Sequence, residues 1–160
     1  EYDKPIGRFI HMYQEGEYDL DVRSQVLIYM ADFAKDAEKV RKWLDGGRTV
    51  VLDRYVTTTM AYQGIRGFPV DGIVRLAEAV GLPAPDVILY LDITPRTSRE
   101  RKMKEKGKLD RNESDSKLLE NLRGFYAGLI EKGVFGKWER IDGSGTKECV
   151  FGKVKELLGL

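Results

Sequence analysis

Cysteine and histidine are almost absent from this sequence. Its 160 residues include one cysteine, Cys149, and one histidine. A single cysteine excludes an internal disulfide framework and is typical of proteins in a reducing compartment, so we expect a cytoplasmic protein. So few nitrogen and sulfur ligands also argue against a structural zinc site.

Long hydrophobic runs and an excess of one charge are lacking as well. No apolar stretch approaches the length of a membrane span, and the first residues do not form a signal peptide. The 27 lysines and arginines nearly balance the 26 aspartates and glutamates, which argues against attraction of the whole surface to nucleic acid. A content of 42% hydrophobic and 33% charged residues excludes a disordered or collagen-like chain. We therefore expect one domain over residues 1–160.

Three short apolar runs predict β-strands. They cover residues 49–52, 87–91 and 138–141, and each ends directly before an aspartate. The first two runs are rich in β-branched residues and nearly unbroken, which is typical of strands buried on both faces in a parallel sheet.

The segments between these runs have the period of amphipathic helices. Apolar stripes in residues 22–44, 70–80, 118–129 and 150–158 predict four helices, the last with Thr146 as its N-cap. Helices that alternate with strands are typical of an α/β fold, in which a parallel sheet is flanked by helices.

A stretch of polar residues follows the first predicted strand and is the main candidate site. It begins with Asp53-Arg54-Tyr55 and continues through Thr58 to Ala61-Tyr62-Gln63-Gly64. Parallel sheets bind ligands at the carboxyl ends of their strands. A carboxylate there can hold Mg²⁺, and an arginine can grip a phosphate with two parallel hydrogen bonds. An isolated Asp-Arg pair would more often be a salt bridge at a turn, so the longer run is what favours a phosphate site.

A basic segment at residues 96–111 is a second candidate. It has eight basic side chains against three acidic ones. Such runs usually form a solvated helix face, and nucleic-acid binding would call for interleaved aromatic residues, which this segment lacks. Its position after the second predicted strand favours a lid that closes over phosphates.

The stretch from Asp53 to Gly64 resembles the signature of the thymidylate kinase family, which has Asp-Arg-Tyr, a small hydroxyl residue and Ala-Tyr-Gln at this spacing. The resemblance covers essentially the whole chain, with further similar segments at residues 5–7, 27–32, 91–95 and 110–113. It implies a three-layer αβα fold of the P-loop NTPase type with a basic lid at about residues 96–113. It also implies a homodimeric nucleoside monophosphate kinase that transfers the γ-phosphoryl group of ATP to dTMP with Mg²⁺.

The same resemblance implies roles for single residues. Arg54 would bind the phosphate of the acceptor nucleotide, and Asp53 would lie beside the magnesium ion and the transferring phosphate. Tyr29 would stack on the thymine ring, although its place in a helical stripe equally fits a core aromatic. Three further residues would line the acceptor site: Thr58, Tyr62 and Gln63. Arg101 and Arg111 of the basic segment would contact the donor nucleotide, and Arg111 would also be catalytic.

Two departures of the sequence from the family pattern bear on its function. No phosphate-binding loop of the form Gly-x-x-x-x-Gly-Lys-Ser/Thr occurs in it, and residues 142–147, which come nearest, fit a glycine turn before the last helix. We expect that loop to precede Glu1 in the complete protein; the alternative is a catalytically silent relative that binds nucleotides or dimerises. The second departure is Phe33, which stands where the family has an arginine and leaves open a kinase for a different monophosphate.

Overall fold

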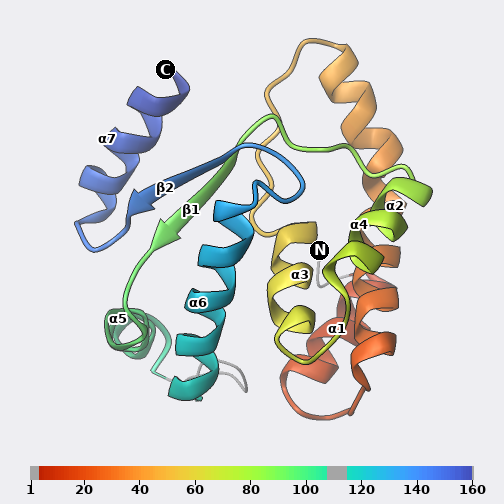
Figure 1. Ribbon diagram of the computed structural model, residues 1–160, viewed down its shortest axis with the longest axis horizontal. Coiled ribbons are helices and arrows are strands. Elements are labelled where there is room, and N and C mark those ends of the chain that lie inside the picture. Colours follow the sequence, from red (N-terminus) through yellow and green to blue (C-terminus); the bar gives the residue numbers. More distant parts are fainter. Residues whose placement is uncertain (1–3, 108–114, 160) are drawn as a thin grey trace. The chain divides into compact units, whose positions relative to one another are not determined.

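The computed structural model describes residues 4–107 and 115–159 (Figure 1). They form two compact units, Glu1–Ala84 and Pro85–Leu160. The prediction of a single domain over residues 1–160 stays a prediction. Among the described residues, no helix combines the length and the apolar character needed to cross a membrane.

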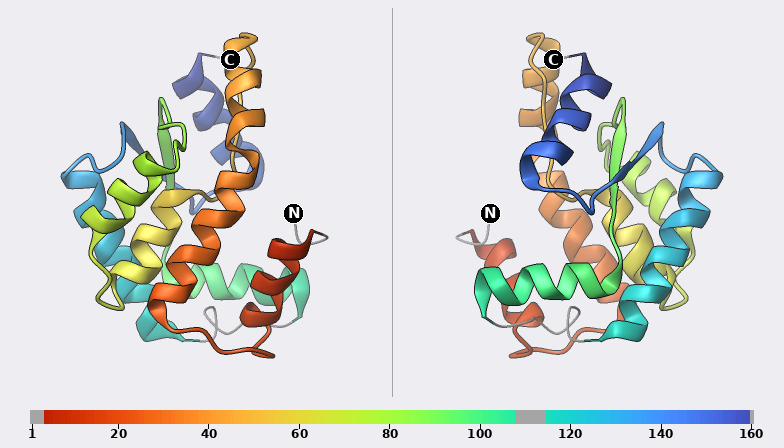
Figure 2. Two further views of the ribbon diagram at one scale, coloured as in Figure 1. Left: turned by 90° about the vertical axis from the view of Figure 1, so that its right-hand side faces the viewer. Right: turned by 90° about the vertical axis from the view of Figure 1, so that its left-hand side faces the viewer.

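The first unit is helical. Helix α2 packs against each of the other three helices of the unit, and α3 also packs against α4. Figure 2 shows α1 and α2 side by side. The elements are α1 (Pro5–Gln14), α2 (Val22–Asp45), α3 (Val56–Gly64) and α4 (Val70–Ala79).

The core of this unit surrounds α3. Val56, Met60 and Ala61 of that helix are fully buried, as are Val26 of α2 and Ile73 of α4. Burial of five apolar side chains stabilises the position of α3 by several kcal/mol, on the order of 1.5–3 kcal/mol for each large side chain. Residues 53–55, which lead into α3, are therefore attached to a firmly packed helix.

The second unit contains the sheet. Strands β1 (Ile88–Asp92) and β2 (Trp138–Asp142) are parallel, in a register that places Ile88 opposite Trp138 and Asp92 opposite Asp142. The crossover between them contains α5 (Pro95–Lys106) and α6 (Ser116–Glu131), and α7 (Lys147–Leu158) follows β2. The parallel pairing with a helical crossover confirms the predicted α/β class. The Thr146 hydroxyl accepts a hydrogen bond from the Cys149 amide, which confirms Thr146 as the N-cap of α7.

Two expectations about the strands are wrong for the described residues. Residues 49–52 do not form a strand, and Val51 in that segment is 83% exposed. Strand β1 is half-buried rather than buried on both faces, and its Leu91 is exposed. Within the described residues, β1 and β2 pair only with each other, so each is an edge strand that is paired on one side only. Residues 49–52 have no partner strand there with which to form backbone hydrogen bonds.

Candidate functional site

The Asp53-Arg54 pair lies directly before α3, and the side chains of both residues are exposed. Arg54 has a φ of 65°, the left-handed conformation that side chains other than glycine rarely adopt. The next residue, Tyr55, is extended and occupies the N-cap of α3 without a capping side-chain hydrogen bond. Asp53 and Arg54 thus stand directly before the first turn of a helix, whose unpaired N–H groups are suited to anions.

Tyr55 fixes this turn to the rest of the unit. Its hydroxyl donates a hydrogen bond to the Pro83 carbonyl at 3.2 Å, and burial raises its pKa to about 12. Its ring meets the Phe33 ring edge-on, with the centroids 5.0 Å apart. Phe33, the residue that departs from the family pattern, is therefore part of an aromatic contact between α2 and the start of α3.

The acceptor-site residues expected on α3 differ in exposure. Thr57 and Thr59 are buried, whereas Thr58 is half-buried, so Thr58 is the most exposed of the three threonines. Tyr62 is also half-buried. Gln63 is only 2% exposed, and within the described residues its Oε1 has no hydrogen-bond partner. A buried acceptor without a donor costs about 1–3 kcal/mol, which marks Gln63 as a candidate to accept from a ligand.

Tyr29 shares a face of α2 with Phe33, because the two residues are one helical turn apart. Tyr29 is half-buried, whereas its neighbour Met30 is 2% exposed and belongs to the core. Since Phe33 contacts Tyr55, this face of α2 is directed at the start of α3. The structure thus places Tyr29, Phe33 and the Asp53-Arg54 turn within one unit and on neighbouring elements.

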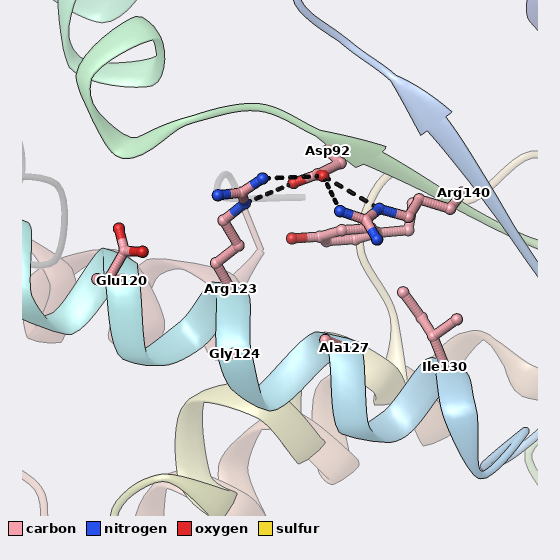
Figure 3. A pocket seen from close by; sticks show the side chains of 8 residues that line it. Asp92, Glu120, Arg123, Gly124, Ala127, Ile130 and Arg140 are labelled. Atoms are coloured by element: carbon pink, nitrogen blue, oxygen red, sulfur yellow. Dashed lines mark hydrogen bonds and ion pairs between the residues drawn. The ribbon is translucent and has the colours of Figure 1, made fainter.

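A cluster that sequence analysis missed lies in the second unit. Asp92, at the end of β1, accepts hydrogen bonds from Arg123 Nε on α6 at 2.8 Å and from Arg140 Nε on β2 at 3.0 Å (Figure 3). The two guanidinium groups, that of Arg123 first, lower the pKa of Asp92 to about 2. The cluster borders a cavity of about 310 Å³ that Tyr90, Ala127 and Ile130 also line. Both arginines are bonded to one carboxylate, so the cluster fastens α6 to the sheet.

Replacing Asp92 by asparagine is expected to destabilise the fold in a pH-dependent way. The pKa of Asp92 is lowered on folding, so its ionised form stabilises the protein above the ordinary value of 3.8. That contribution, about 2 kcal/mol at neutral pH, disappears as the pH falls toward 2. Urea unfolding of the wild-type and Asp92→Asn proteins should therefore differ at pH 7 and nearly coincide at pH 2. An equal difference at both pH values would contradict the ion-pair explanation.

The basic segment is described only as far as Gly107. Arg101 of α5 donates hydrogen bonds to three consecutive carbonyl groups, those of Gly143 at 2.7 Å, Ser144 at 2.6 Å and Gly145 at 2.8 Å. Arg96, by contrast, bonds to Glu100 on the exposed side of the same helix. Arg111 lies outside the described residues, as does the lid's predicted part from residue 108 onward. The prediction of a lid therefore stays a prediction.

The fold and the site together define an α/β protein with an exposed Asp-Arg turn directly before one of its helices. A sequence model described as "Thymidylate kinase" matches residues 1–154. Curated proteins named thymidylate kinase are similar to the chain: that of Chlorobium luteolum is 35% identical over 76% of this chain and 62% of its own length. The thymidylate kinase of Clostridium novyi is 31% identical over 87% of this chain and 70% of its own length. That of Leptospira borgpetersenii serovar Hardjo-bovis is 29% identical over 90% of this chain and 69% of its own length.

The chain belongs to the thymidylate kinase family, which confirms the predicted resemblance. It spans 62% of the length of the Chlorobium luteolum relative and 69% of that of the Leptospira relative.

Proposed function

We propose that the complete protein is a nucleoside monophosphate kinase that transfers the γ-phosphoryl group of ATP to dTMP and yields dTDP. The observation that carries this proposal is the Asp53-Arg54 turn at the N-terminus of α3. A guanidinium beside helix N–H groups suits a phosphate, and the neighbouring carboxylate suits a cation that accompanies phosphates. Family membership supports the choice of nucleotides.

On this proposal, the residues of the first unit bind the acceptor nucleotide. Arg54 holds the phosphate of dTMP with two parallel hydrogen bonds. Thr58 and Gln63 supply hydrogen-bonding groups, and Gln63 Oε1 is suited to accept a donor from the ligand. Tyr29 stacks on the base, and Tyr62 packs beside the sugar. Phosphoryl transfer demands little covalent chemistry from a protein, so these residues act by holding the acceptor in line with the donor phosphate.

Asp53 is the proposed magnesium ligand. The described residues contain no group of three or more histidine, cysteine, aspartate or glutamate side chains that could cage a metal. Mg²⁺ does not require such a cage, because it usually binds to one or two carboxylates and completes its shell with water and phosphate oxygens. The exposed carboxylate of Asp53 fits that mode of binding. A bound Mg²⁺ would neutralise part of the phosphate charge.

A homodimer and a cytoplasmic location belong to the same proposal. Exposed apolar side chains on the first unit support contact with a second copy of the chain. They include Met12 of α1, Tyr18 between α1 and α2, and Leu27 of α2, which is 60% exposed. The cytoplasm supplies both nucleotides of the proposed reaction.

The direct test is a nucleotide screen with the complete protein, purified from its source after its intact mass has been measured. ATP and Mg²⁺ are offered with dTMP, dUMP, dCMP, dGMP or AMP, and a matched reaction contains EDTA. We expect dTMP to be phosphorylated at least about tenfold faster than the others, with no product in EDTA. Preference for another monophosphate would overturn the choice of dTMP and implicate Phe33. Binding of dTMP without transfer would show a silent relative.

A further inference from the structure

The contacts of Arg101 differ from those expected of a residue that binds phosphate. Its guanidinium donates to the carbonyl oxygens of Gly143, Ser144 and Gly145, which are more than 40 residues away in the chain. These three groups come from one loop, so their oxygens converge on a single cation. The planar fork of an arginine can bond to all three at once, whereas a lysine offers a single point of charge.

The loop itself is built for this contact. The Gly143 amide donates to the Asp92 carbonyl at 2.9 Å, and a side chain at Gly143 would stand 2.7 Å from Ile93 Cγ2. Asp142 Oδ1 accepts from the Ser144 amide at 2.9 Å and from the Ser144 hydroxyl at 2.6 Å. These hydrogen bonds lower the pKa of Asp142, so the turn is anchored by an ionised carboxylate.

The end of the loop is also the beginning of α7. A side chain at Gly145 would lie 3.3 Å from Cys149 Sγ in the first turn of that helix, and Thr146 is its N-cap. Helix α7 buries no residue completely, and its N-terminus continues directly from this loop, so the position of the loop bears on that end of the helix.

We propose that Arg101 is a positioning residue that fastens the 143–145 loop, and with it the N-terminus of α7, to helix α5. Both terminal nitrogens of its guanidinium donate hydrogen bonds to carbonyl groups of the protein backbone. The resemblance to thymidylate kinases implies that Arg101 lies at the donor nucleotide. With both terminal nitrogens bonded to the loop, Arg101 would act on the donor through the shape of the loop rather than by hydrogen bonds to the donor phosphates. This last step rests on the proposed kinase function.

The first test follows hydrogen–deuterium exchange of peptides that cover residues 142–150 in the complete protein. We expect Arg101→Ala to accelerate exchange there by about tenfold or more and to leave α6 unchanged, because charge-assisted hydrogen bonds are lost only at the loop. Arg101→Lys should also exchange fast, since the single ammonium nitrogen of a lysine cannot reproduce contacts that two separate guanidinium nitrogens make. Arg96→Ala is the matched control: it removes the same charge from an exposed position of α5 and should exchange like the wild type. Unchanged exchange in Arg101→Ala would overturn the proposal.

The second test separates a positioning role from direct contact in the kinase assay. Arg101→Ala and Asp142→Ala, which loosens the loop while Arg101 is retained, should both raise the KM for ATP by about tenfold and leave the KM for dTMP unchanged. Normal ATP kinetics in Arg101→Lys, together with fast exchange of its loop, would show that the charge of Arg101 acts directly and would overturn the proposal. If the wild-type protein does not phosphorylate dTMP at all, the proposed function fails, while the exchange experiment still decides whether Arg101 fastens the loop.

Discussion

Replacing Arg54 by alanine is expected to lower the rate of dTMP phosphorylation by about 100-fold or more, with the fold intact. The physical reason is that the side chain of Arg54 is exposed and has no part in the core, whereas the phosphate of the acceptor would lose its bidentate partner. Initial rates with varied dTMP, together with the melting temperature, measure the two effects separately. Wild-type kinetics in this variant would exclude Arg54 as the acceptor ligand.

Arg54→Gly and Arg48→Ala are the controls for this prediction. Glycine adopts the φ of 65° without steric cost, so Arg54→Gly should be as inactive as Arg54→Ala but more stable than it, by up to about 1 kcal/mol. Arg48→Ala removes an exposed arginine six positions earlier and should keep normal activity. If both arginine-to-alanine variants lost activity equally, general charge rather than the position of Arg54 would be responsible.

Replacing Asp53 by asparagine is expected to reduce phosphoryl transfer by about 100-fold or more and to raise the Mg²⁺ concentration needed for half-maximal rate. Asparagine keeps the size of the side chain but removes the charge that would hold the ion. Titration of the reaction with MgCl₂ at saturating ATP and dTMP measures the effect. Asp45→Asn is a suitable control, because Asp45 is another exposed aspartate, at the end of α2.

The Mg²⁺ titration also shows whether Asp53 acts on the metal or on the fold. A lower maximal rate with an unchanged Mg²⁺ midpoint would contradict its assignment as a ligand. A melting temperature of Asp53→Asn far below those of the wild type and Asp45→Asn would instead indicate a structural role.

Much of the fold could be predicted because its helices are amphipathic. Helices α2, α4, α6 and α7 each have an apolar stripe at helical spacing, and their predicted bounds differ from the observed ones by a few residues. Helix α3 could not be found in this way. Three successive threonines disfavour a helix, and the helix is buried on several sides, so no single stripe stands out. Packing against α2 and α4 decides its conformation.

The candidate site could be predicted from the sequence where its residues are adjacent in the chain. Asp53 and Arg54 are adjacent in the sequence, and the motif around them singled them out. The left-handed conformation of Arg54 leaves no such signal, because no glycine or asparagine marks it. The contacts of Asp92 with Arg123 and Arg140 were equally hidden, since 31 and 48 residues separate the partners. Charges so far apart are brought together only by the fold.

The register of the two strands has a consequence for how the second unit assembles. Asp92 and Asp142 are cross-strand neighbours, so pairing β1 with β2 brings two carboxylates to the same end of the sheet. Like charges at adjacent strand positions repel each other, and the repulsion falls only when counter-charges arrive. Arg140 comes with β2 itself, but Arg123 comes with α6. We therefore expect strand pairing and the docking of α6 to be one cooperative event in folding, with neither half stable alone.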